Sequence, residues 1–98
     1  MAQFDVLRSR ASDLLIDCQS EWLRHLESRF VVPLMPLDQA PTPAGRLNPL
    51  FEIEGVTLSM VTQFAGSIDK SHLGELVCSL EDRRYDITGA LDMLVGGY

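Results

Sequence analysis

The side chains that could perform acid–base or metal chemistry are few in this sequence, and they lie far apart along it. His25 and His72 are the only histidines, and neither has the H-x-x-x-H or H-E-x-x-H spacing that brings metal ligands together. No serine lies in the glycine-flanked turn that exposes a hydrolase nucleophile. Glu52 and Glu54 alternate with apolar residues, which is typical of the solvent-facing side of a strand. The sequence therefore predicts no catalytic residue, no bound metal and no cofactor.

Two aromatic residues have the character of contact residues instead. Trp22 lies in the run SEWL at 20–23, directly after an apolar segment, and Tyr98 follows two glycines at 96–97. Tryptophan and tyrosine are over-represented among the residues that dominate binding energy. Two plainer interpretations stay open, because Trp22 could cap the core at a strand end and the last residues could fray. We expect a protein that acts by binding another protein.

The length and composition predict one domain spanning residues 1–98. Hydrophobic residues make up 46% of the chain, and its formal net charge is −6 with an isoelectric point near 4.6. An acidic chain repels phosphate backbones, so we expect it to reach DNA only through a partner. Cys18 and Cys78 are expected to be buried thiols in a reducing cytoplasm. The sequence shows no secretory signal and no membrane-spanning run, so we expect no membrane association.

The elements that carry these contact residues are predicted to form a mainly β fold. Strands are expected at 3–7, 14–19, 29–34, 50–53 and 56–62, with a weaker one at 67–70. Loops are expected at 8–13 and, because all five prolines lie between Pro33 and Pro49, at 35–49. Pro33 cannot donate to a sheet, which predicts an edge position or a bulge. Glu54-Gly55 between two strands predicts a type I′ hairpin turn.

A single helix is predicted at the C-terminal end. Ile87, Ala90, Leu91 and Leu94 recur at helical spacing, with Leu80 one or two turns earlier. The run 79–82 (SLED) has the spacing of an N-terminal capping box, and the glycines at 96–97 are expected to end the helix. A chain this short has few other ways to bury apolar surface, so we expect a two-fold homodimer.

Three sequence blocks resemble the CcdB family of bacterial toxins. They are Gln3-Phe4, the run IDCQSE at 16–21 and the run RFVVPL at 29–34, where the family has approximately QF, VDVQSD and RxVIPL. The resemblance implies an SH3-like antiparallel β-barrel of the CcdB/MazF type with a terminal helix, and a homodimer. It also implies a toxin of a type II toxin–antitoxin system that binds the DNA gyrase A subunit and traps gyrase on cleaved DNA. A CcdA-like antitoxin would neutralise the toxin through a disordered segment, and the two would repress their own operon together.

The resemblance also implies which residues make each contact. The gyrase contacts carry over to Gly96, Gly97, Tyr98, Ser20, Trp22, Leu23 and Asp92. The dimer contacts carry over to Met93, Leu94 and Trp22. Arginines in the two loops, Arg8, Arg10 and Arg46, are expected to contact the antitoxin. The family ends typically in Trp-Gly-Ile, so Gly96 and Tyr98 are departures that put the target or the potency in question.

Two other functions stay open at this point. A homologue that has lost toxicity would keep only its antitoxin and its regulatory role. A MazF-like endoribonuclease would share the fold, but RNA cleavage needs a basic groove, and the net charge of −6 argues against one.

Overall fold

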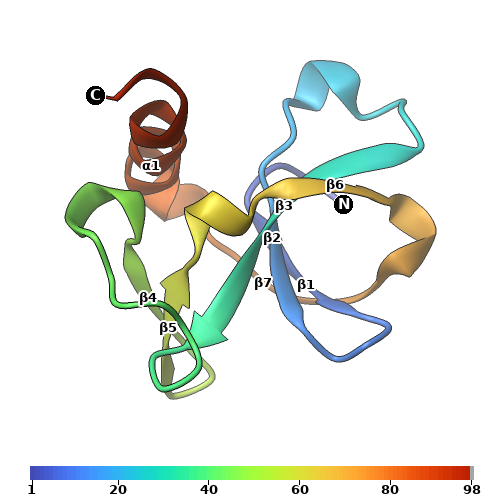
Figure 1. Cartoon of the computed structure of the whole chain (residues 1–98). Coiled ribbons are helices and arrows are strands. Elements are labelled where there is room, and N and C mark those ends of the chain that lie inside the picture. Colours follow the sequence, from blue (N-terminus) through green and yellow to red (C-terminus); the bar gives the residue numbers. More distant parts are fainter. Residues whose placement is uncertain (98) are drawn as a thin grey trace.

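Seven strands form one curled sheet that wraps into a half-barrel, and a single α-helix covers one of its faces (Figure 1). The computed structural model describes residues 1–97. The strands are β1 (Asp5–Ser9), β2 (Leu14–Asp17), β3 (Ser28–Pro36), β4 (Leu50–Ile53), β5 (Val56–Met60), β6 (Gly66–Asp69) and β7 (Leu73–Ser79). The helix is α1 (Arg84–Gly96), and the 3-10 turns are η1 (Glu21–Leu23), η2 (Gly45–Leu47), η3 (Thr62–Phe64), η4 (Lys70–His72) and η5 (Glu81–Arg83). The predicted fold class, mainly β with one C-terminal helix, is confirmed.

The central strand is β3, which changes partner along its length. The sheet runs β4-β5-β3-β2-β1-β7, and β6 pairs with the first half of β3. Residues 28–31 pair with β6, and residues 34–36 pair with β5. Pro33 lies between these two stretches, so its missing N–H falls where neither strand is paired with it. The predicted edge position is wrong, since β3 is paired on both sides, but the irregularity that Pro33 required is there.

The main core lies between one face of the sheet and α1. Ile87 and Ala90 are fully buried, as the helical period predicted. Leu80 is also buried in this core, but it precedes the helix, which begins only at Arg84. The predicted capping box is wrong, because α1 begins at Arg84 and its N-cap, Arg83, makes no side-chain cap hydrogen bond. The Ser79 hydroxyl accepts a hydrogen bond from the Glu81 N–H (3.2 Å), ahead of the turn η5.

One strand, β7, was not predicted from the sequence. It is an edge strand paired only with β1 in the described chain, and most of its side chains are exposed, so it shows no alternation of apolar and polar residues. Gly74 allows the two strands to approach closely, since a Cβ there would lie 2.8 Å from the Arg8 carbonyl oxygen. The β4–β5 hairpin was predicted correctly. Glu54 and Gly55 have φ values of 54° and 78°, as a type I′ turn requires.

Candidate protein-binding site

The most exposed aromatic contact residue lies on the turn η1, between β2 and β3. Trp22 is 90% exposed and Leu23 is 45% exposed. Ser20 begins the turn, and its hydroxyl accepts a hydrogen bond from the Trp22 N–H (3.2 Å). The structure therefore brings Ser20, Trp22 and Leu23 together on one small projection. It also decides one open alternative, because a side chain that is 90% exposed does not cap the core.

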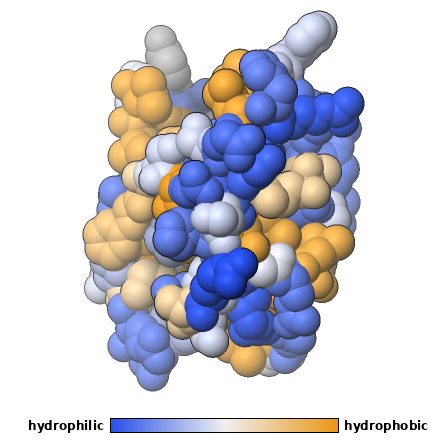
Figure 2. Space-filling model, turned by 90° about the vertical axis from the view of Figure 1, so that its right-hand side faces the viewer, coloured by the Kyte–Doolittle hydropathy of each residue, from blue (hydrophilic) through white to orange (hydrophobic). Residues whose placement is uncertain are grey.

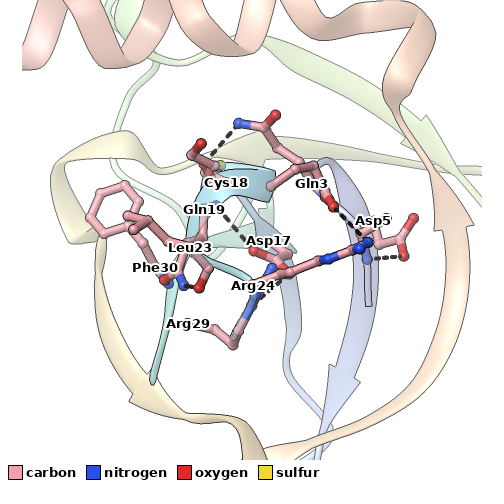
Figure 3. A network of polar contacts seen from close by, with 12 residues as sticks. Gln3, Asp5, Asp17, Cys18, Gln19, Leu23, Arg24, Arg29 and Phe30 are labelled. Carbon is pink, nitrogen blue, oxygen red and sulfur yellow. Dashed lines mark hydrogen bonds and ion pairs between the residues drawn. The ribbon is translucent and has the colours of Figure 1, made fainter. Parts of the chain in front are cut away.

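A buried ion pair lies beneath this projection. Asp17 at the end of β2 is 0% exposed, and Arg29 near the start of β3 is 2% exposed. The Arg29 Nε and Nη2 atoms both donate to Asp17 Oδ2, at 3.0 and 2.5 Å (Figure 3). The pair joins the two strand ends between which the chain leaves the sheet to form η1.

Gln19 connects the ion pair to the turn. Its backbone N–H donates to Asp17 Oδ1 (3.0 Å). Its side-chain amide donates to the Leu23 carbonyl oxygen (2.9 Å) and accepts from the Phe30 N–H (2.8 Å). Gln3 connects the N-terminal segment to the same region, because its side-chain amide donates a hydrogen bond to the Cys18 carbonyl oxygen (3.2 Å). Hydrogen bonds thus hold both ends of the segment 21–28, which leaves the sheet between β2 and β3 and is called the excursion below (Figure 3).

Sequence reasoning missed the pairing of Asp17 with Arg29. Asp17 lies between two apolar residues of a strand, and Arg29 begins the block RFVVPL. A charge next to apolar strand residues is a weak sign of a buried pair, but only the register of β2 against β3 shows which two charges meet. Because Asp17 pairs with Val31 in that register, Arg29 lies two positions before its partner, toward the start of β3.

The second group of predicted contact residues lies at the end of α1. Asp92 and Gly96 are exposed, and Met93 and Leu94 are 39% and 42% exposed. Gly97 ends the helix as predicted, with a φ of 76° and its N–H donating to the Met93 carbonyl oxygen (3.1 Å). Tyr98 lies outside the described residues.

Within one chain, the two groups do not form one patch. In Figure 1 the light blue turn η1 and the red end of α1 both lie at the top of the molecule, but on opposite sides of it. The proposed dimer contacts Trp22, Met93 and Leu94 are therefore separate within one chain.

The three arginines expected in loops are separated as well. The predicted loop 8–13 begins too early, because β1 extends to Ser9 and Arg8 is a strand residue. Arg8 lies between Glu54 and Glu75 at 3.2 and 3.4 Å. Arg10 donates through Nε to the Ser71 carbonyl oxygen (2.6 Å). Arg46 lies against α1, where its Nη2 is 3.5 Å from a helix carbonyl oxygen. Each arginine has partners of its own, and Arg46 lies on a different surface from Arg8 and Arg10.

The two loops that carry them do meet, in a shallow groove. Ser12 and Asp13 from the first loop face Gln39 from the second across a hollow of about 270 Å³. Met35, which was predicted in the second loop, lines the hollow from the end of β3. Arg8 lines the same groove. Its floor is apolar, formed by Leu14, Leu34 and Leu58.

Comparison with known proteins identifies the family. The model of the CcdB family, described as CcdB protein, matches residues 3–97. The chain belongs to the CcdB family. No curated protein matches its sequence.

Solved structures of other proteins have the same fold. The chain is similar to an endoribonuclease from a mycobacterial species, with a TM-score of 0.79 and 14% identity over 98% of this chain and 91% of that one. It is also similar to the Mycobacterium tuberculosis toxin MazF-mt6, with a TM-score of 0.70 and 14% identity over 90% of this chain and 91% of that one. At this identity the likeness establishes a shared fold.

In this CcdB-family chain, the three sequence blocks behind the resemblance meet in one place. Gln3, Asp17, Gln19 and Arg29 all belong to them, and all are members of the polar network beneath η1. The blocks therefore build the support of the Trp22 turn.

The positive charges of this CcdB-family chain are mostly neutralised within it. Among residues 1–97, six of the eight lysines and arginines form ion pairs within 4.0 Å. The other two, Arg10 and Arg46, lie on different surfaces. Figure 2 shows one face, on which hydrophilic and hydrophobic residues are interspersed. The described residues thus form no basic groove of the kind that holds a phosphate backbone.

The remaining reactive side chains form no site. His25 and His72 are exposed, as predicted. No three metal-ligating side chains gather among residues 1–97. Cys18 and Cys78 are free thiols, the first buried and the second half-buried. Burial raises the pKa of the Cys18 thiol to about 12, with the nearby Asp17 charge adding to the effect, so this thiol is a poor nucleophile at neutral pH. None of the helices formed by residues 1–97 has the length and apolar character needed to cross a bilayer.

Proposed function

We propose that this protein is the toxin of a type II toxin–antitoxin system, that it binds the DNA gyrase A subunit, and that it traps gyrase on cleaved DNA. The observation that carries the proposal is the rigidly supported, 90% exposed Trp22 in a chain that belongs to the CcdB family. A tryptophan exposed to this degree contributes little to the fold, yet it is the residue type most enriched in binding hot spots. The protein acts in the cytoplasm, where gyrase works, by contact and without chemistry of its own.

The grip on gyrase has two parts. One is the turn with Ser20, Trp22 and Leu23, and the other is the end of α1 with Asp92 and the segment 96–98. Gly96 stands where the family typically has tryptophan, so the second part offers less apolar area than in such relatives. We expect binding to persist and to be weaker, with Trp22 and Tyr98 partly compensating.

A two-fold homodimer would combine both parts. Val95 is 85% exposed beside the partly exposed Met93 and Leu94, so α1 offers an apolar surface that a second copy can cover. Two copies would then present two α1 ends close together to the gyrase A dimer, which has matching two-fold symmetry.

A CcdA-like antitoxin would occupy the groove between the loops 8–13 and 35–39. The apolar floor suits an extended disordered segment, whose acidic residues would pair with the arginines. Arg8 lines this groove, whereas Arg10 and Arg46 lie elsewhere, so exposed pairs with the antitoxin would contribute only about 0.2–1 kcal/mol each. Replacing Arg8, Arg10 and Arg46 with alanine should lower antitoxin affinity modestly in a calorimetric titration. An unchanged affinity would remove these arginines from the interface. Bound together, toxin and antitoxin would repress their operon, with the antitoxin contacting the DNA.

An endoribonuclease is the second candidate function, because one similar solved structure is an endoribonuclease by name and another is a MazF toxin by name. The distribution of charge argues against it. Arg29 is buried against Asp17 and cannot contact a phosphate, and five more cations have carboxylate partners. A fold shared at 14% identity does not carry the activity with it.

One experiment distinguishes these functions. The protein is expressed from a regulated promoter in bacteria with wild-type gyrase and in bacteria whose gyrase A subunit resists CcdB toxins. Growth arrest only in the first strain, with cleaved DNA covalently bound to gyrase, is the expected result. Equal arrest in both strains with fragmented cellular RNA would establish the ribonuclease instead. Growth of both strains, with antitoxin binding retained, would indicate a homologue that has lost toxicity.

A further inference from the structure

The excursion that carries Trp22 has little contact with the rest of the fold. All eight residues from 21 to 28 are exposed. A segment without buried side chains gains no position from hydrophobic packing. Its position must come from polar contacts. At its two ends the Glu21 carboxylate accepts a hydrogen bond from the Gln3 N–H, and the Glu27 carbonyl oxygen accepts one from the Lys70 N–H (2.8 Å). At its base the contacts are made by Asp17, Gln19 and Arg29.

The ion pair at this base is poorly explained by stability. Removing two charges from water costs several kcal/mol per ion, and well-packed apolar side chains are often as stabilising as a buried pair. An apolar pair cannot form the hydrogen bonds that fix the orientation of neighbouring groups. Arg29 fixes the Asp17 carboxylate, and Asp17 Oδ1 in turn fixes the backbone N–H of Gln19 at 3.0 Å.

Gln19 passes this geometry to the turn. Its amide bonds to Leu23 inside η1 and to Phe30 on the returning strand, at 2.9 and 2.8 Å. The side chain therefore spans the opening of the excursion and sets the distance between its two ends.

We propose that Gln19, oriented by the Asp17–Arg29 pair, is a positioning residue that pre-organises Trp22 for its partner. The inference rests on the proposed gyrase contact of Trp22. A partner that meets a fixed indole avoids the entropy cost of ordering the turn during binding, so loss of Gln19 should raise the Kd by about tenfold.

The test uses Trp22 as its own reporter, since it is the only tryptophan. Gln19→Met removes both side-chain hydrogen bonds at similar volume. Asn48→Leu is the matched control, because Asn48 is another buried amide that holds a loop, bonding to Ala44, Met60 and Gln63. Time-resolved tryptophan anisotropy and gyrase A affinity are measured for both variants, together with their melting temperatures.

The expected result is a faster anisotropy decay and an affinity loss of about tenfold in Gln19→Met, with neither change in Asn48→Leu at a similar drop in melting temperature. A decay unchanged in Gln19→Met overturns the positioning role. If that variant unfolds, the double variant Asp17→Leu, Arg29→Met tests the same point, because it leaves no unpaired charge. If wild type does not bind gyrase A, the proposed function fails, while the anisotropy still decides whether Gln19 fixes the turn.

Discussion

Replacing Trp22 with alanine should separate binding from folding. The side chain is 90% exposed and makes no part of either the core or the polar network. Surface substitutions of this kind usually change the free energy of unfolding by less than about 0.5 kcal/mol. Because Trp22 is also an expected dimer contact, the comparison is made at a concentration where variant and wild type sediment as the same species. Chemical denaturation should then give the same midpoint for both.

The effect on gyrase binding should be much larger. A tryptophan buries about 150–250 Å² when covered, and at about 25 cal/mol per Å² this corresponds to at most about 4–6 kcal/mol. Interface side chains deliver only part of such a value, and hot-spot truncations commonly cost about 2 kcal/mol or more. We expect the Kd for the gyrase A subunit to rise by roughly 30-fold or more in a calorimetric titration.

The control is Tyr85→Ala, since Tyr85 is 83% exposed and lies on the first turn of α1, away from η1. It should leave the Kd unchanged. If Trp22→Ala binds gyrase A within about threefold of wild type, a change below about 0.7 kcal/mol, then Trp22 is not an anchor and the assignment of η1 to the interface is wrong.

Three further outcomes are expected. Leu94→Lys places a charge on the proposed dimer surface, so sedimentation at micromolar concentration should show more monomer than wild type, and a wild type that is already monomeric would contradict the dimer. Gly96→Trp restores the aromatic residue that the family typically has there, so gyrase A affinity should rise, and an unchanged affinity would place the tail outside the contact. The pKa of the Cys18 thiol is raised in the folded state to about 12 from 9.0, so its contribution is complete below pH 9 and is lost as pH rises toward 12. The free energy of unfolding of wild type should therefore fall more over this pH range than that of Cys18→Ala. Parallel curves of unfolding free energy against pH for the two proteins would refute the shift.

Local sequence signals predicted the elements that bury one clear face. The period of Ile87 and Ala90 located α1, and Glu54-Gly55 located the hairpin, because each residue pattern reflects a backbone requirement of its own segment. The strand β7 was missed because it lies at the sheet edge with both faces largely exposed, so burial left no alternation in its sequence. The start of α1 was misplaced because the 3-10 turn η5 comes between Ser79 and the helix, and that turn depends on how the following residues pack.

The sequence predicted the exposed residues of the candidate site, but it did not predict the polar network beneath them. The exposure of Trp22 was one of two open alternatives in the sequence, since nothing local distinguishes an aromatic cap from a displayed aromatic. The network beneath it depends on residues 3, 17, 19 and 29, which only the strand register brings together. Long-range pairing of this kind cannot be read from one sequence, because each member alone resembles an ordinary polar residue near a strand.

One fold can support different functions in different proteins. A curled sheet leaves its excursions free to vary, and their function depends on which side chains are exposed at them. In this chain the arginine at the base of the excursion, Arg29, faces inward to Asp17, and its charge supports the turn from beneath. The group displayed outward is an indole, which suits a protein surface better than it suits a phosphate backbone. The acidity of the chain acts in the same direction, since a net charge of −6 disfavours RNA and favours basic protein partners. The exposed Trp22, the buried Arg29 and the negative net charge therefore all favour the proposed action, which is contact with another protein.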